Sequence, residues 1–136
     1  MTANKPKNPE MLFPLFISEK LEETKRYYVE KLGFEATVDQ PEYLQVRYGA
    51  AGAPELCFMR PNAVPNAPPR PLFAGNGVIV SVPTEDADSA CKRMQQKGAS
   101  IEEQPSDKPW GWRSFLVRDP NGVVLDFFHV YKEVAM

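Results

Sequence analysis

The sequence predicts an α+β fold in which two tandem βαβββ modules form a curved mixed sheet around a crevice. Two observations carry this prediction: an apolar strand followed by an amphipathic helix occurs twice, and both copies keep the same spacing. Ile17 and Val82 end the two first strands, and Gly33 and Gly98 follow the two helices. The same number of positions separates the members of each pair, so we interpret the chain as an internal repeat.

In the first module, residues Met11–Ile17 form an apolar strand candidate. Ser18 is a plausible N-cap, and acidic residues follow it near the positive end of the predicted helix. The helix is expected to reach about Lys31, where Gly33 stops it. Three further strand candidates follow, at Phe34–Val38, Tyr43–Tyr48 and Glu55–Arg60.

The second module begins with a strand candidate at residues Gly77–Val82, and Thr84 is the expected cap of its helix. Apolar residues recur at helical spacing, at Ala87, Ala90, Cys91 and Met94. The remaining strand candidates are Ser100–Glu103, Ser114–Arg118 and Val123–Val130. Between the last two, Asp119-Pro-Asn-Gly122 supplies a tight turn, since Pro120 fixes φ and Gly122 tolerates positive φ.

A proline-rich connector, residues 61–71, separates the two modules and cannot join a sheet ladder. We therefore expect one domain over residues 1–136, with module one at about 11–60 and module two at about 76–131.

Composition excludes several classes of protein. Of 136 residues, 43% are hydrophobic and 25% charged, and the net charge is −2 with both signs interspersed, so no basic face suggests a nucleic acid partner. No apolar run approaches the roughly 20 residues of a membrane span, and the first ten residues lack the apolar core of a signal peptide. Two cysteines are too few for a disulfide framework. We expect a cytoplasmic protein with reduced thiols and no membrane partner.

Two motifs extend the repeat into a family resemblance. Tyr27-Tyr28-x-x-Lys-Leu-Gly-Phe34 lies in the first module and Asp-Pro-Asn-Gly122 precedes the last strand. With the duplicated βαβββ pattern, they resemble the vicinal oxygen chelate superfamily, which includes glyoxalase I, extradiol dioxygenases, thiol-transfer fosfomycin resistance proteins and bleomycin resistance proteins. The run Lys108-Pro-Trp-Gly-Trp-Arg113 is most similar to the bleomycin-resistance-like members. The resemblance implies a homodimer with two crevices.

The resemblance also implies where a metal would bind in metal-dependent members. Asp126 stands at the last-strand position, and internal alignment puts Cys57 at its partner position. The first-strand positions fall near Leu12 or Phe13 and near Asn76 or Gly77, where most of these side chains cannot coordinate. The single histidine, His129, falls on the opposite strand face from Asp126 by alternation. We therefore predict no metal and no cofactor, although a strand shift would recruit Glu19, Glu42 or Glu55.

Strand alternation then assigns the residues that line the crevice. Glu55, Cys57 and Met59 line one half, and Val124, Asp126 and Phe128 line the other. Tyr43, Gln45 and Arg47 face the cleft, because their apolar neighbours pack on a helix. The alternative is a two-sided core in which Glu55 and Arg47 pair.

Trp110 and Trp112 precede the closing hairpin, and two indoles in a turn-rich segment are costly to expose. We expect one of them to be structural and the other, Trp110 by resemblance, to lie nearer a ligand. Asp126 has three interpretations: it pairs with Arg47 or Arg113, it binds a cationic ligand group, or it is a remnant acid of a metal site.

The candidate ligand-binding residues are therefore Arg47, Glu55, Cys57, Met59, Trp110, Trp112, Asp126 and Phe128. They predict a metal-free protein that binds a small aromatic or cationic compound in an apolar crevice. No catalytic residue is assigned. The alternatives are a divalent-metal lyase, isomerase or dioxygenase of glyoxalase type with an atypical ligand set, and a metal-free enzyme with Asp126 or Glu55 as general base.

Overall fold

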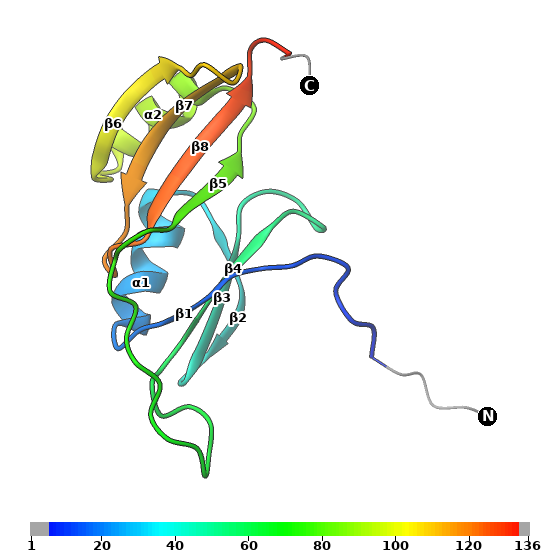
Figure 1. The fold of residues 1–136 in the computed structure, drawn as a ribbon, viewed down its shortest axis with the longest axis vertical. Coiled ribbons are helices and arrows are strands. Elements are labelled where there is room, and N and C mark those ends of the chain that lie inside the picture. The colour runs from blue at the N-terminus through cyan, green and yellow to red at the C-terminus, as the bar shows by residue number, and fades with distance from the viewer. Residues whose placement is uncertain (1–5, 134–136) are drawn as a thin grey trace, which may run out of the picture.

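A computed structural model describes residues 6–133 and confirms the predicted α+β fold. Each βαβββ module forms a four-stranded sheet with a helix on one of its faces (Figure 1). We call the face of each sheet that contacts its helix the helix side, and the opposite face the open face. Within residues 6–133, no helix combines the length and apolar character that crossing a membrane requires.

The first module forms a mixed sheet in the order β1-β4-β3-β2. Its elements are β1 (Leu15–Ile17), α1 (Leu21–Arg26), the π-helical turn η1 (Tyr27–Lys31), β2 (Glu35–Gln40), β3 (Tyr43–Arg47) and β4 (Glu55–Met59). β1 runs parallel to β4, and the other neighbours are antiparallel. Leu44 and Val46 are buried in the core, whereas Tyr43 and Gln45 alternate with them on the open face.

The second module repeats this arrangement in the order β5-β8-β7-β6. Its elements are β5 (Ile79–Pro83), α2 (Ala87–Gln96), β6 (Ile101–Asp107), β7 (Trp112–Arg118) and β8 (Val124–Val130). Asp126 on β8 lies between Ser81 of parallel β5 and Leu116 of antiparallel β7. The closing hairpin starts two residues earlier than predicted, at Trp112.

The first helix begins later than predicted and changes character. Its N-cap is Lys20, not Ser18, because the Ser18 hydroxyl is used elsewhere: it accepts from the Lys20 amide at 2.9 Å and donates to Asn121 at 2.5 Å. The helix then widens into η1, where the Leu32 amide bonds the Tyr27 carbonyl at 3.2 Å. This wide turn lets both tyrosines reach the second module: the Tyr28 hydroxyl donates to Asp119, and the Tyr27 hydroxyl accepts from the Ser100 amide.

The second helix is capped by Asp86 rather than by Thr84. The Asp86 carboxylate accepts a hydrogen bond from the Ser89 amide at 3.2 Å, in extended backbone geometry typical of an N-cap. The Thr84 hydroxyl instead contacts the Tyr48 hydroxyl at 3.1 Å. The predicted apolar stripe is confirmed, since all four of its residues are buried.

The two modules share one hydrophobic core, formed by their helix sides. Phe127 of β8 packs its ring against Tyr48 and Phe34 of the first module, with ring centroids 5.3 and 6.3 Å apart. Phe127 also stacks on Phe115 of β7. Because the helix sides meet in this core, the open faces of both sheets point away from it.

A hydrogen-bond network joins α1 and η1 to the Asp119–Gly122 turn. The Tyr28 hydroxyl donates to Asp119 at 2.8 Å, and the Asn121 amide donates to Thr24 at 2.8 Å. Asp119 also accepts from the backbone amides of Asn121 and Val123. We call this the inter-module network. It places the β7–β8 turn beside α1 (Figure 1).

The proline-rich connector runs outside both sheets, as predicted. After it, the Phe73 amide bonds the Ile17 carbonyl and the Phe73 ring packs edge-on to Phe16 at 5.0 Å. Gly122 then approaches Gly75 closely: a Cβ on Gly122 would lie 3.4 Å from the Gly75 Cα, and Gly122 has φ of +88°. The positive φ favours glycine there, whereas the space would just admit a Cβ.

Candidate functional site

The open face of the second sheet carries the aromatic and acidic residues predicted for the crevice. β7 contributes Trp112, Ser114 and Leu116, and β8 contributes Asp126 and Phe128, since strand alternation turns the residues between them toward α2. Ser114 pairs with Phe128 and Leu116 with Asp126 across the two strands. The sheet therefore holds an acidic side chain, a hydroxyl and two aromatic rings on one surface.

Asp126 is buried, with 7% of its surface exposed, although its strand face carries no helix. One carboxylate oxygen, Oδ2, accepts from the Ser81 hydroxyl at 3.3 Å. The other, Oδ1, has no hydrogen-bond partner among residues 6–133, and the same holds for the buried Ser114 hydroxyl. Buried polar atoms without partners are uncommon in folded proteins and need an explanation.

The aromatic rings form a continuous stack beside this carboxylate. Trp112 lies flat on Phe128, with ring centroids 3.7 Å apart and planes 10° from parallel. Trp110 meets Trp112 edge-on at 6.4 Å and is 53% exposed. Trp112 is thus held by packing, whereas Trp110 offers an indole to solvent.

The open face of the first sheet carries a polar chain whose members bond one another. The Tyr43 hydroxyl donates to Gln45 at 2.9 Å, and the Gln45 amide donates to Glu55 Oε1 at 3.0 Å. Thr37 donates to the same Glu55 oxygen. Glu55 is therefore supplied with donors from its own sheet, unlike Asp126 on the second sheet.

Cys57 and Met59 occupy the same open face as Glu55, because they alternate with buried Leu56 and Phe58 along β4. Cys57 is fully buried, and burial raises the pKa of its thiol; the nearby Glu55 carboxylate adds to this, while a hydrogen bond with Tyr43 opposes it. Burial also raises the pKa of the Tyr43 hydroxyl. Both groups stay protonated at neutral pH, so this pair lacks the thiolate that nucleophilic catalysis needs.

The arginines proposed as partners of the acidic residues are engaged elsewhere. Arg47 donates to Glu35 at 2.9 Å and to the Gly49 carbonyl, so the predicted alternative of an Arg47–Glu55 pair does not form. Arg47 keeps its place on β3 directly opposite Glu55.

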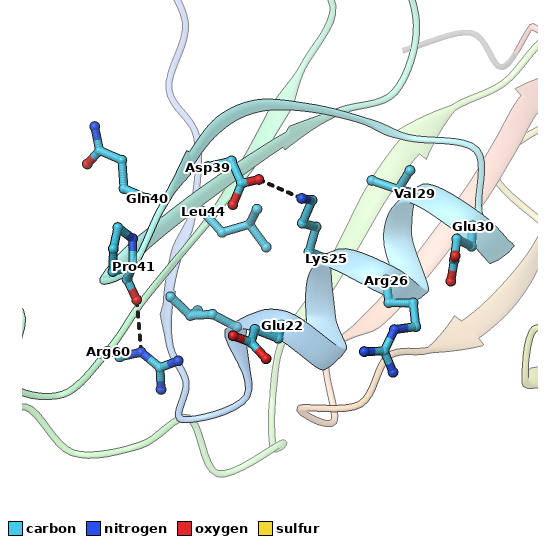
Figure 2. A pocket seen from close by; sticks show the side chains of 11 residues that line it. Glu22, Lys25, Arg26, Val29, Glu30, Asp39, Gln40, Pro41, Leu44 and Arg60 are labelled. Atoms are coloured by element: carbon cyan, nitrogen blue, oxygen red, sulfur yellow. Dashed lines mark hydrogen bonds and ion pairs between the residues drawn. The ribbon is translucent and has the colours of Figure 1, made fainter.

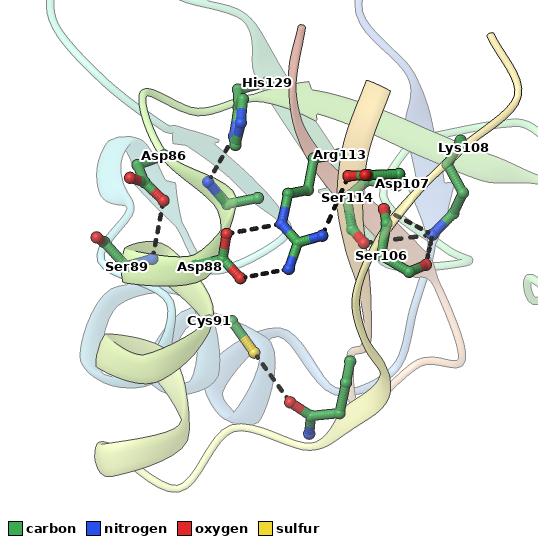
Figure 3. A network of polar contacts seen from close by, with 12 residues as sticks. Asp86, Asp88, Ser89, Cys91, Ser106, Asp107, Lys108, Arg113, Ser114 and His129 are labelled. Atoms are coloured by element: carbon green, nitrogen blue, oxygen red, sulfur yellow. Dashed lines mark hydrogen bonds and ion pairs between the residues drawn. The ribbon is translucent and has the colours of Figure 1, made fainter. Parts of the chain in front are cut away.

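Arg113 lies on the helix side of β7, where it binds Asp88 of α2 through two nitrogens, at 2.7 and 2.9 Å, and Asp107 at 3.1 Å (Figure 3). These two carboxylates hold the pKa of Arg113 above its usual value, and Arg113 lowers the pKa of Asp88. His129 also lies on this side, since its Nδ1 accepts from the Ala87 amide at 2.8 Å. Neither Arg113 nor His129 reaches the open face, so Asp126 is not paired with Arg47 or Arg113.

The donor set does not fit a metal centre. Among residues 6–133, no three His, Cys, Asp or Glu side chains lie close enough to share an ion. Asp126 has only hydroxyl neighbours, Ser81 and Ser114, and Cys57 belongs to the other sheet. The first-strand positions, at residues 12–13 and 76–77, lie just before β1 and β5. A divalent ion in a catalytic site requires three or more nitrogen, oxygen or thiolate ligands, so we derive no step through a metal.

A groove of about 670 Å³, which sequence reasoning missed, lies between α1 and the β2–β3 hairpin (Figure 2). Acidic and basic side chains alternate around it, and Lys25 bonds Asp39 across it at 2.5 Å. Leu44 lies at its base, and the Arg60 side chain donates to the Pro41 carbonyl at 3.0 Å. None of the eight predicted site residues lines this groove. Its walls come from residues distant in sequence, so no local pattern indicates it.

Sequence reasoning also missed Ser81 and Ser114, the two hydroxyls nearest Asp126 on the sheet. A signal was present for both. Ser81 is the only polar residue in Val78–Val82, and Ser114 is polar at the alternating position between Trp112 and Leu116.

Comparison with known proteins gives the family. Residues 14–127 match the Glyoxalase/Bleomycin resistance protein/Dioxygenase superfamily, and this match includes residues of both modules. The chain therefore belongs to this superfamily. No curated protein sequence matches the chain.

Solved structures share the fold over most of the chain. A glyoxalase/bleomycin resistance protein from Streptomyces sp. CB03234 is 27% identical, with a TM-score of 0.64 over 86% of this chain and 97% of that chain. TioX from Micromonospora sp. ML1 is 24% identical, with a TM-score of 0.65 over 88% and 97% of the two chains. A glyoxalase/bleomycin resistance protein/dioxygenase from Nocardioides is 18% identical, with a TM-score of 0.68 over 98% and 93%. The last two relatives are similar in fold alone.

Proposed function

We propose that the protein is a metal-free small-molecule binding protein that holds an aromatic or cationic compound in an apolar crevice. The observation that carries this proposal is the Trp112–Phe128 stack beside the buried Asp126 on an uncovered sheet face. A small-molecule site typically combines apolar and aromatic walls with a few directed polar groups.

Trp110 supports the aromatic part of the proposal. Its indole is more than half exposed and already makes an edge contact with Trp112. A flat ligand that stacks on these rings would gain about 0.5–1.5 kcal/mol per favourable pair beyond the area it buries. The names of relatives in the superfamily include bleomycin resistance protein, which is consistent with a drug-like ligand.

We infer that a second copy of the chain completes the crevice in the cytoplasm. In one chain the helix sides are used by the shared core, and the edge strands of both sheets carry exposed apolar residues, Leu15 of β1 at 47% and Ile79 of β5 at 60%. A homodimer that brings the first sheet of one copy to the second sheet of another would cover these residues. The opposite wall of the crevice would then carry Glu55, Cys57, Met59 and Arg47.

The alternative enzymes receive less support from the residues present. A divalent-metal lyase, isomerase or dioxygenase lacks a suitable donor set around Asp126. A general base at Glu55 would have to release the two donors that already bond its Oε1. These observations favour binding over catalysis.

A thermal-shift screen of aromatic and cationic compounds tests the proposal, with wild type compared with Trp112→Ala. A ligand at 100 times its dissociation constant should stabilise the wild type by about 2.7 kcal/mol. Trp112→Ala should lose this shift, and Leu72→Ala, which removes an exposed apolar residue just after the connector, should keep it.

Calorimetric titration with manganese, iron, nickel and zinc tests the proposal that the protein binds its ligand without a metal. We expect no stoichiometric binding. An ion bound with micromolar affinity or better would contradict the proposal and direct the work to glyoxalase and dioxygenase assays.

A further inference from the structure

The acidic side chains of the two open faces differ in the number of hydrogen bonds that they accept, and this difference indicates which of them is available to a ligand. On the first sheet, Glu55 receives donors from Thr37 and Gln45. On the second sheet, Asp126 receives one long hydrogen bond, from Ser81 at 3.3 Å. Its Oδ1 and the neighbouring Ser114 hydroxyl are buried without partners in the described part of the chain.

No cation of the described chain is seen to compensate the Asp126 carboxylate. Arg47 binds Glu35, and Arg113 binds Asp88 and Asp107 on the far side of the sheet. A buried carboxylate that no cation compensates destabilises the ligand-free protein. Such a cost is retained where a ligand supplies the missing charge.

The geometry specifies where that ligand group would lie. Asp126 and Ser114 occupy neighbouring positions on the sheet, because Ser114 pairs with Phe128, two residues from Asp126 on β8. Phe128 is also the lower ring of the Trp112 stack. A ligand whose donor reaches Oδ1 would therefore have these two rings beside it.

Resting on the proposed function, we propose that the ligand is an aromatic cation whose protonated nitrogen binds Asp126 Oδ1, with a further hydrogen bond to Ser114, while its ring packs at Trp112 and Phe128. The carboxylate accepts only from a donor, and an N–H⁺ group both donates and neutralises it. In this arrangement the second sheet binds the charged group of the ligand. The first sheet forms the opposite wall of the crevice and makes no contact with that charge.

The test compares two fluorescent probes of similar size: 9-aminoacridine, a flat cation, and acridone, a flat neutral ring system. We expect the wild type to prefer the cation. Asp126→Asn, which is isosteric, should weaken binding of 9-aminoacridine about tenfold or more and leave acridone unchanged, because a hydrogen bond between charged groups is lost. Glu23→Gln, which removes one surface charge from α1, should bind both probes as the wild type does.

A second measurement separates a ligand anchor from a structural carboxylate. Without ligand, Asp126→Asn should unfold at the same or a higher urea concentration than the wild type, because the uncompensated charge has been removed. A clear loss of stability would mean that a cation within the protein already compensates the carboxylate, and it would overturn the inference.

The outcomes distinguish this inference from the proposed function. If both probes bind and Asp126→Asn binds 9-aminoacridine as tightly as the wild type, the inference alone is overturned. If Asp126→Asn changes the oligomeric state instead of the probe preference, a second copy supplies the donor and the inference is wrong. If neither probe binds at Trp112, the proposed function fails and the inference fails with it.

Discussion

Asp119 is a single residue on which the attachment of the two modules depends. It accepts hydrogen bonds from the Tyr28 hydroxyl and from two backbone amides, and it is 5% exposed. Removing its side chain in Asp119→Ala leaves the buried Tyr28 hydroxyl without a partner. We expect this change to lower the free energy of unfolding by about 2–4 kcal/mol.

The pH dependence of stability tests the same residue. Burial raises the pKa of the Asp119 carboxyl, and the hydrogen bonds from Tyr28, Val123 and Asn121 only partly oppose this. The folded protein therefore binds the proton at a higher pH than the unfolded chain, whose pKa is about 3.9. The contribution of this group to stability is lost as pH rises through the raised folded value, and it is regained as pH falls toward about 4.

Urea unfolding across this pH range should show the effect. Relative to Asp119→Asn, which keeps the acceptor for the turn and does not titrate, the wild type should become more stable as pH falls from about 7 to about 4. Parallel stability curves for the two proteins would contradict this prediction.

At this scale the sequence pointed to the unusual position of Asp126 but not to the partners of Arg47 and Arg113. Asp126 was identified because an acid in an apolar strand is costly, and it is indeed buried. Arg47 lies directly opposite both Glu35 and Glu55, and it binds Glu35, whereas Glu55 accepts from Thr37 and Gln45 instead. This choice of partner depends on the neighbouring strands and is not visible in one strand.

At the scale of the element, the start of α2 gives a prediction. Asp86→Ala removes the acceptor of the Ser89 amide and should cost about 1 kcal/mol, whereas Asp86→Asn should cost much less. Chemical unfolding of both variants, with Thr84→Ala as a comparison, checks the position of the cap. A larger loss in Thr84→Ala than in Asp86→Ala would restore Thr84 as the cap.

Within residues 6–133, the sequence located each strand and both helices, and it placed the starts of the strands at Tyr43 and Glu55 correctly, but it misplaced the starts of the two helices. Thr84 and Asp86 are both good capping residues, and composition alone cannot choose between them. Ser18 lies before the first turn: its hydroxyl accepts from the Lys20 amide, ahead of the helix start at Leu21, and donates to Asn121, far along the chain. The π-helical turn was not predicted either, because it depends on contacts of Tyr27 and Tyr28 with the second module. In each case a tertiary contact decides a local structure.

For the whole molecule, we predict a homodimer whose interface includes the edge strands β1 and β5. Light scattering at micromolar concentration should give twice the mass of the 136-residue chain. Ile79→Glu introduces charge on an exposed apolar position of β5 and should give a monomer that still folds, because Ile79 lies outside the core. A stable dimer of this kind buries at least about 1,200 Å² in total.

A monomeric wild type would contradict this prediction and would confine any binding site to surfaces within one chain. Glu23→Gln, which changes an exposed charge on α1 rather than on an edge strand, serves as the control and should remain dimeric.

The βαβββ architecture of each module was predictable, because the spacing of its strand and helix patterns occurs twice in the sequence. The docking of the modules through their helix sides could not be predicted in this way. It depends on Phe127 meeting Tyr48 and Phe34, and on the inter-module network, which join residues about a hundred positions apart. The separation of the candidate site into two open faces follows from that docking.

This separation bears on how such a scaffold can change over time. The contacts that join the modules, between α1 and the Asp119–Gly122 turn, share no residue with the open faces that carry Asp126 and Glu55. Substitutions that alter recognition are therefore free of the constraints that maintain the architecture. Proteins that share this arrangement of modules can change the class of ligand that they bind while the contacts needed for folding stay the same.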